Sequence, residues 1–195
     1  MGYLASDGSI AGRNNGIKIG IAESDKEILE KIKAEVDIER KIKSTKTSNG
    51  FLTAELEWSS YQQKQDLAKY GIVNNKTYLP LHLPDFENDD NKKLAFILGY
   101  FDGDGSISVS KDNYLRMRFC SYRIEILQDF ANFFEKKYNA KYSLSKDHKR
   151  EMYELSISTT YAKLIFEDCY NLNTICLERK HKKYLEYKNH ETTTT

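Results

Sequence analysis

The nine residues GYFDGDGSI at positions 99–107 repeat, with changes, the nine residues GYLASDGSI at positions 2–10. Six of the nine positions are identical, and the two stretches are offset by 97 residues. In each copy an apolar segment containing glycine runs into Asp-Gly, where we expect a helix to end and a strand to begin. Self-similarity at so long a period indicates a duplicated domain rather than a solenoid of short repeats.

The similarity continues through both halves of the chain. Predicted strands lead into amphipathic helices at residues 26–36 and 124–138, a further pair of strands follows in each half, and helices at residues 61–70 and 161–170 close the halves. Each half therefore reads αββαββα, which predicts the α+β fold class with two pseudo-symmetric halves. We place the first half at residues 1–84, an acidic linker at 85–91 and the second half at 92–195.

Composition limits the class of protein. Of the 195 residues, 39% are hydrophobic and 30% charged, which is typical of a globular protein with an ordinary core. No apolar run approaches the ~20 residues that span a bilayer, and no secretory signal is visible. Three cysteines without C-x-x-C spacing argue against a disulfide framework or a zinc ribbon. We expect an intracellular protein, in a bacterial or phage cytoplasm or an organelle matrix, and not a secreted one.

Charge is unevenly distributed along the chain. The formal net charge is +1, but residues 1–90 carry −3 and residues 91–195 carry +4. Acidic residues gather at 85–90 and basic residues at 179–183. Charge alone leaves open whether these runs bind a partner or are ordinary solvated segments.

The duplication gives Asp7 and Asp104 equivalent positions, each at the end of a helix with small residues upstream. Glycine in a helix indicates close approach of another backbone, so we expect the two helices to lie side by side and to bring the carboxylates together. Neighbouring carboxylates repel, and a divalent cation ligated by oxygen, Mg²⁺ or Mn²⁺, would neutralise them. Such ions support hydrolysis of phosphodiesters. The alternative, that Asp-Gly only forms a turn, is weakened by the repetition.

Residues 97–107 resemble the LAGLIDADG motif of homing endonucleases, and residues 2–10 look like a second, degenerate copy. The resemblance covers essentially the whole chain and implies two four-stranded antiparallel sheets that form a saddle. It implies that Asp7 and Asp104 bind the catalytic metal ions together with the main-chain carbonyls of Ser6 and Gly103. Asp102 matches the other acidic position of the motif, which is generally structural, and Ala5 replaces it in the first copy.

The resemblance also implies a basic residue beside each metal site, after each closing helix. This role maps to Lys76 and Lys180, with Arg179 as a neighbour that could substitute; the alternative is an exposed lysine near a turn. One departure concerns the first motif, which starts at Met1 and therefore lacks the upstream turns of its helix. Either the recorded start lies inside a longer protein or this half is weakened, and activity is affected more than fold.

In this family the sheets lie along the major groove of DNA, which strands can enter. Lys, Arg and hydroxyl side chains on the polar faces supply contacts to bases and phosphates. The residues that we expect to contact DNA are Arg13, Lys18, Lys41, Lys43, Ser106, Ser108, Arg116, Arg118, Lys141 and Ser143. Alternatively, they only form the solvated faces of the sheets.

The expected function is a site-specific endonuclease that cuts both strands of a long, asymmetric double-stranded DNA target with divalent metal ions, acting as a monomer with internal pseudo-twofold symmetry. The alternative is a non-cleaving nucleic-acid binder on the same fold, either an intron RNA maturase or a DNA-binding protein that has lost catalysis. The presence of both Asp7 and Asp104 favours the enzyme.

Overall fold

The computed structural model describes residues 1–36 and 39–193 and contains two halves that share one order of elements, to which the second half adds a final helix. The elements of the first half are α1 (Gly2–Ser6), β1 (Gly8–Ile10), β2 (Gly16–Ala22), α2 (Glu27–Val36), β3 (Lys43–Lys46), β4 (Leu52–Ser59) and α3 (Tyr61–Ala68). Those of the second half are α4 (Asp90–Asp104), β5 (Gly105–Val109), β6 (Leu115–Ser121), α5 (Ile124–Tyr138), β7 (Tyr142–Asp147), β8 (Met152–Ser158), α6 (Thr159–Asn171) and α7 (Glu178–Thr193). The predicted αββαββα order is confirmed in both halves.

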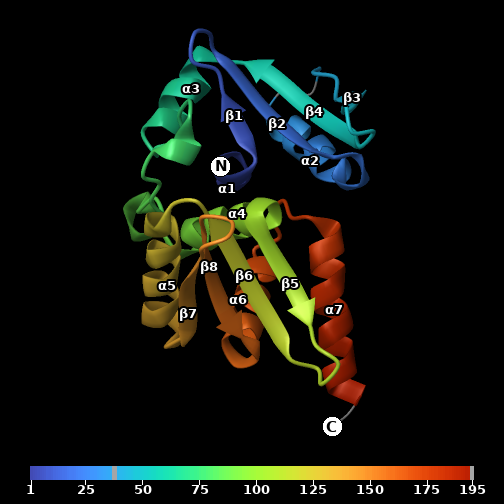
Figure 1. Ribbon diagram of the computed structural model, residues 1–195, viewed down its shortest axis with the longest axis vertical. Coiled ribbons are helices and arrows are strands. Elements are labelled where there is room, and N and C mark those ends of the chain that lie inside the picture. The colour runs from blue at the N-terminus through green and yellow to red at the C-terminus, as the bar shows by residue number, and fades with distance from the viewer. Residues whose placement is uncertain (37–38, 194–195) are drawn as a thin grey trace.

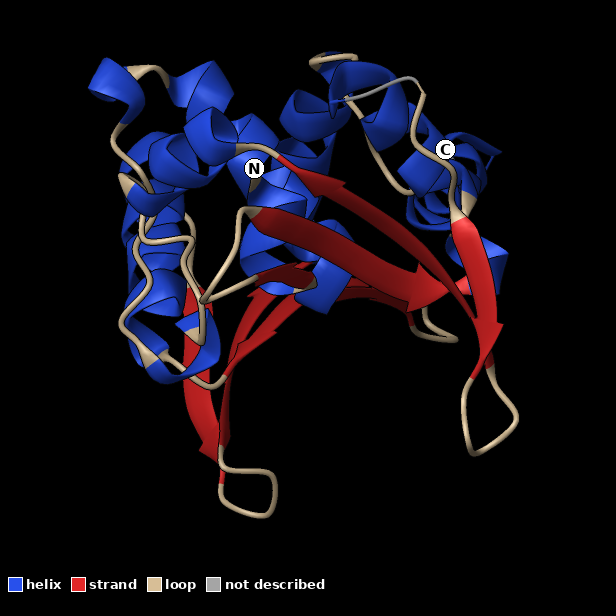
Figure 2. Ribbon diagram, turned by 90° about the horizontal axis from the view of Figure 1, so that it is seen from above, coloured by secondary structure: helices blue, strands red, loops and turns tan. Residues whose placement is uncertain are grey.

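Each half contains a four-stranded antiparallel sheet with equivalent strand order, β1-β2-β4-β3 and β5-β6-β8-β7. Alternation along the strands determines which face is buried. In β6, for example, Leu115, Met117 and Phe119 are buried, whereas Arg116 and Arg118 lie on the opposite face. Figure 2 shows that the helices cover one side of the two sheets, which together form an arch that is open on the other side. The α+β fold with a saddle of two sheets is confirmed.

The two helices that carry the repeated motif pack against each other between the halves (Figure 1). A Cβ at Gly2 would collide with the backbone oxygen of Phe96, and one at Gly99 would lie 2.9 Å from the backbone nitrogen of Tyr3. The glycines thus permit the close backbone approach predicted from the sequence. Helix α1 has five residues, whereas α4 has 15 and begins at the N-cap Asp89, whose side chain accepts a hydrogen bond from the backbone of Lys92.

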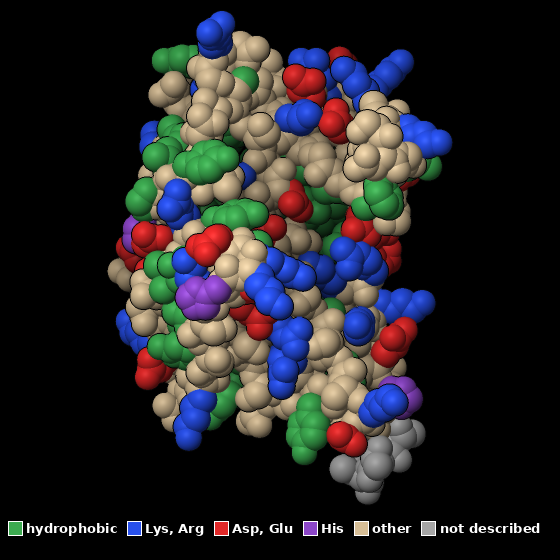
Figure 3. All heavy atoms as spheres, in the orientation of Figure 1, with side chains coloured by type: hydrophobic (Ala, Val, Ile, Leu, Met, Phe, Trp, Pro, Cys, Tyr) green, Lys and Arg blue, Asp and Glu red, His purple; other side chains and the backbone are tan. Residues whose placement is uncertain are grey.

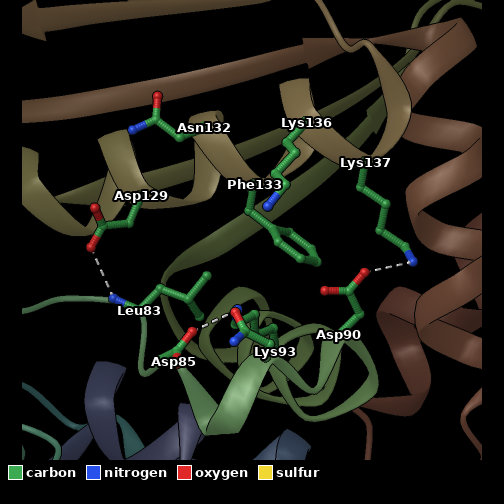
Figure 4. Close-up of a pocket in the computed structure, with 10 residues that line it drawn as sticks. Leu83, Asp85, Asp90, Lys93, Asp129, Asn132, Phe133, Lys136 and Lys137 are labelled. Carbon is green, nitrogen blue, oxygen red and sulfur yellow. Dashed lines mark hydrogen bonds and ion pairs between the residues drawn. The ribbon is translucent and has the colours of Figure 1, made fainter.

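The segment that joins the halves is anchored to helices of the second half (Figure 4). Asp129 of α5 accepts a hydrogen bond from the backbone of Leu83, at 3.1 Å. Asp85 pairs with Lys93 at 3.0 Å and Asp90 with Lys137 at 3.2 Å. Asp85 and Asp90 of the acidic run therefore pair with lysines of α4 and α5.

Two details differ from the expectations. A strand was expected at residues 39–47, but β3 spans Lys43–Lys46; residues 39–42 form a turn and coil, so Lys41 lies outside the sheet. The basic run at residues 179–183 belongs to a helix, α7, that the sequence analysis did not predict. Within residues 1–36 and 39–193, no helix is long and apolar enough to cross a membrane.

Candidate active site and nucleic-acid face

Asp7 and Asp104 lie at the ends of the paired helices, where each helix gives way to the first strand of its sheet. Asp7 is the C-cap of α1, and Asp104 is the last residue of α4. A glycine must follow each of them. A Cβ at Gly8 would lie 2.5 Å from the carbonyl oxygen of Leu4, and one at Gly105 would lie 2.5 Å from that of Phe101. The repeated Asp-Gly is therefore a requirement of this helix-to-strand junction.

The junction brings the two motifs into contact. A Cβ at Gly103 would lie 2.8 Å from Oδ2 of Asp7 and would collide with the side chain of Ser6. The Asp7 carboxylate thus reaches across to the residue that precedes Asp104. The structure places four of the residues predicted for the metal site together, namely Ser6, Asp7, Gly103 and Asp104.

The surroundings of the two carboxylates disfavour their negative charge. Both remain accessible to solvent, yet the loss of water around Asp104 and, to a smaller extent, the negative charge of Asp7 together raise the pKa of Asp104 to about 6. Burial likewise raises the pKa of Asp7, while the nearby Lys180 and Lys76 oppose the change. A bound cation would stabilise both negative charges, so the residues present fit a divalent metal ion ligated by oxygen.

The two predicted lysines hold the ends of the motif helices. Lys180 is buried and its Nζ donates hydrogen bonds to the carbonyl oxygens of Phe101, Asp102 and Gly105, at 2.6, 2.9 and 2.7 Å. Lys76 is half-buried and donates to those of Ser6 and Gly8, at 3.0 and 2.6 Å. These carbonyls lie at the negative ends of the helices, which favour a cation. Burial lowers the pKa of both lysines, that of Lys180 to about 8.

The site opens on two sides, and each opening combines residues of both motifs. The first, which we call the Asp7 hollow, is a cavity of about 500 Å³ whose polar lining includes Asp7, Asp25, Glu55, Asp102, Gly103 and Arg179. The second, the Asp104 hollow, is a smaller cavity of about 70 Å³ whose lining includes Ala5, Ser6, Lys76, Asp104, Tyr122 and Arg123. Each hollow therefore pairs the aspartate of one motif with the residue before the aspartate of the other.

Two contacts near the Asp7 hollow join the halves and were not predicted. Arg179 binds the carboxylate of Asp25 through two hydrogen bonds, of 2.8 and 3.0 Å. The backbone nitrogen of Glu178 donates to Glu27 at 3.1 Å. These pairs are more than 150 residues apart in sequence, so no local pattern could reveal them. Arg179 is consequently tied to Asp25 instead of standing in for Lys180.

The open face of the second sheet brings together most of the residues predicted to contact DNA there. Ser106 and Ser108 of β5 lie opposite Arg118 and Arg116 of β6, and Ser143 of β7 lies opposite Ser156 of β8. Lys141 shares a surface hollow with Arg116 and Ser143. Arg118 has Glu154 at 3.7 Å, whereas Arg116 is exposed. Figure 3 shows a group of Lys and Arg side chains just below the junction of the halves.

The open face of the first sheet is more acidic. Lys18 of β2 pairs with Glu55 of β4 at 3.0 Å, and Lys43 of β3 lies opposite the same glutamate. Glu57 is exposed beside Lys18. Arg13 lies in the exposed loop between β1 and β2, and Lys41 precedes β3, so neither is part of the sheet itself.

Solved structures share this architecture. The homing endonuclease I-WcaI bound to its DNA recognition sequence superimposes with a TM-score of 0.63 over 92% of this chain and 82% of that chain, at 16% identity. I-SmaMI bound to an uncleaved DNA target in the presence of calcium ions gives a TM-score of 0.60 over 96% and 87%, at 13% identity. The N-terminal LAGLIDADG domain of DUF199/WhiA gives 0.54 over 86% and 77%, also at 13% identity. At these identities the likeness establishes the fold.

The sequence itself supplies the family. No curated protein matches the chain. The family model of the LAGLIDADG-like domain, however, matches it twice, at residues 1–75 and 91–169. Each match contains nearly all of one motif helix, one complete sheet and two further helices, whereas α7 lies outside the second match. The chain therefore belongs to the LAGLIDADG family.

Proposed function

We propose that this protein is a site-specific endonuclease that hydrolyses both strands of a long, asymmetric double-stranded DNA target and depends on Mg²⁺ or Mn²⁺. The observation that carries the proposal is the meeting of Asp7 and Asp104 between the halves, where the Asp7 carboxylate lies against Gly103 and the charges of the two aspartates repel. Two aspartates whose charges repel at a helix junction suit cation binding.

Each residue of the site can take a separate role in the reaction. Asp7 and Asp104 would hold the metal ions, with the carbonyl oxygens of Gly103 and Ser6 as further ligands. A bound divalent cation supplies a Lewis acid for the phosphodiester and lowers the pKa of water. Lys76 and Lys180 fix the helix ends that position the aspartates, and their positive charge is close enough to affect the pKa of both carboxylates. The same charge would favour the developing negative charge on a phosphate.

Two hollows, each with the last aspartate of one motif, allow one reaction on each strand. Because the halves differ in sequence on their open faces, they can contact different half-sites, and the target need not be palindromic. The serines and arginines of β5 and β6 are suited to contact bases, since Arg forms two hydrogen bonds with guanine in the major groove. Solved structures of similar fold that are bound to DNA support this choice of partner.

The test is cleavage of a plasmid library that carries candidate targets. With Mg²⁺ we expect linear product from a subset of plasmids, and with Ca²⁺ binding without cutting. Asp104→Asn should lower the cleavage rate by about 10²-fold or more, whereas Asp112→Asn, on an exposed turn, should leave it unchanged. Binding without cutting in every metal would contradict the proposal.

A specific observation also supports the non-cleaving alternative, a binder of DNA or intron RNA. The carbonyl of Ser6, an expected metal ligand, already accepts a hydrogen bond from Lys76 at 3.0 Å. In addition, the first sheet presents glutamates on the face that would meet phosphates. If this alternative holds, the protein will retain a selected DNA or RNA fragment from the library, and Asp104→Asn will not change its affinity by more than about twofold.

A further inference from the structure

The two hollows have equivalent aspartates but different charged surroundings. The Asp7 hollow is lined by four carboxylates and one cation, namely Asp7, Asp25, Glu55, Asp102 and Arg179. The Asp104 hollow is lined by one carboxylate and two cations, namely Asp104, Lys76 and Arg123. The pseudo-symmetry of the fold therefore does not extend to the electrostatics of the site.

Neighbouring ion pairs reduce this difference but do not remove it. Arg179 is bound to Asp25, Lys18 is bound to Glu55, and Lys180 lies close enough to Asp7 to affect its titration. Lys180 and Lys76 act on both Asp7 and Asp104, so these four groups are common to the two hollows. Once the two ion pairs are set aside, the hollows differ by Asp102 on one side and Arg123 on the other, a difference of two charges. A divalent cation would thus be attracted more strongly in the Asp7 hollow than in the Asp104 hollow.

The excess charge of the Asp7 hollow comes from Asp102. This side chain is 2% exposed, and its Oδ2 accepts a hydrogen bond from the backbone of Leu177 at 2.8 Å. Its Oδ1 is buried and has no hydrogen-bond partner among the described residues. The equivalent position in the Asp104 hollow is Ala5, which offers no oxygen. A buried carboxylate oxygen without a partner is costly unless a cation or an ordered water satisfies it.

We infer that the two hollows bind divalent cations with unequal affinity, that the Asp7 hollow is the tight site, and that Asp102 tightens it. The inference rests on the metal dependence proposed above. Asp102 acts through its charge rather than as a direct ligand, because its side chain is 2% exposed and its Oδ2 accepts a hydrogen bond from Leu177. At low metal concentration only the Asp7 hollow is filled.

Mn²⁺ titration followed by electron paramagnetic resonance of the free ion tests the inference without any need for a DNA target. The wild-type chain should show two classes of site whose dissociation constants differ on the order of tenfold, because the hollows differ by two charges. Asp7→Asn should remove the tight class and Asp104→Asn the weak class. Asp102→Asn, which keeps an acceptor for Leu177, should weaken the tight class several-fold without affecting the weak one.

Arg123→Gln provides an independent variant on the other side. It should strengthen the weak class several-fold, and Arg150→Gln, which removes an equal charge from the exposed turn between β7 and β8, should change neither class. Two equal sites, or loss of the tight class in Asp104→Asn, would overturn the inference and leave the proposed nuclease intact. Absence of any Mn²⁺ binding would overturn both.

Discussion

The first and second halves of the molecule share one backbone plan, but their polar residues differ. Both halves place an aspartate and a lysine at the junction of the motif helix and the first strand. At some other positions near the site, the two halves carry residues of opposite charge. After the second strand of each sheet, for example, the first half has Asp25 and the second half has Arg123. The duplication thus conserves the geometry that positions the aspartates, while the surroundings have diverged.

The comparison shows which properties the fold imposes. Glycines that allow the helices to meet, and glycines that follow the aspartates, are needed in both halves because any Cβ would collide with backbone. The open faces of the sheets carry no such constraint, so one presents Arg and Ser and the other Lys and Glu. Residues required by packing are repeated, and residues that face solvent or a ligand are free to specialise.

The largest expected difference between the halves concerns the two lysines. Lys180→Met would leave three carbonyl acceptors without their donor in a buried site, and it should lower the free energy of unfolding by about 3 kcal/mol. Lys76→Met affects two carbonyls at a half-buried position and should cost about 1 kcal/mol. Guanidinium unfolding followed by circular dichroism measures both values.

Lys182→Met is the matched control, because Lys182 is exposed on the same helix as Lys180. It should change the free energy of unfolding by less than about 0.5 kcal/mol. If Lys76→Met and Lys180→Met lower the free energy of unfolding by the same amount, the two ammonium groups stabilise the protein equally despite their different burial. The two halves would then not differ at the ends of their motif helices.

The sequence predicted the repeated elements because packing imposed them on both copies. It also predicted that Asp7 and Asp104 would be neighbours, since glycines upstream of each indicated a close helix pair. Helix α7 was missed because the basic residues at 179–183 dominate this part of the sequence and obscure its apolar pattern. The buried residues here are Leu177, just before the helix, and Lys180, Tyr184 and Tyr187 within it. Their spacing is helical and could have revealed the element.

The contact of Arg179 with Asp25 could not be predicted from the sequence, for a different reason. It joins segments 154 residues apart, and nothing in either segment specifies the other. The opposed charges of Asp25 and Arg123 were, by contrast, accessible from the repeat. An alignment of residues 17–29 with residues 115–127 places them at the same position. Differences between duplicated copies are therefore as informative as identities, because they mark positions that packing leaves free.

The open faces of the two sheets provide a second test of the difference between the halves, with an effect of intermediate size. Arg116→Ala removes an exposed guanidinium from the second sheet and should weaken binding of a selected duplex by about 1–2 kcal/mol, with a shallower dependence on salt. Glu57→Gln removes an exposed negative charge from the first sheet and should strengthen binding several-fold. Fluorescence anisotropy at two salt concentrations measures both effects. Opposite signs support a shared DNA surface, whereas no effect of Glu57→Gln would show that the first sheet lies away from the duplex.

The smallest expected effect concerns stability and pH. Burial and Asp7 raise the pKa of Asp104 to about 6 in the folded protein, so the folded state holds its proton more tightly than the unfolded state does. Without divalent metal, the stability contributed by this group is therefore present at low pH and lost as the pH rises through about 6. Asp104→Asn, which stays neutral, should be more stable than the wild type above that pH by at most about 1 kcal/mol, because solvent still reaches the carboxylate.

The advantage should vanish near pH 4, where Asp104 is protonated in the wild type. It should reverse when enough Mg²⁺ is added to fill both hollows, because the wild type then gains stability from an ion in each hollow and the variant only from an ion in the Asp7 hollow. Thermal unfolding of both proteins across this pH range, with and without Mg²⁺, provides the measurement. The equivalent variant Asp7→Asn should gain less, since the largest charge effect at Asp7 comes from Lys180 and opposes burial, whereas at Asp104 it comes from Asp7 and adds to burial. Equal gains for the two variants would indicate that the carboxylates share one electrostatic environment, and the distinction between the two hollows would then be lost.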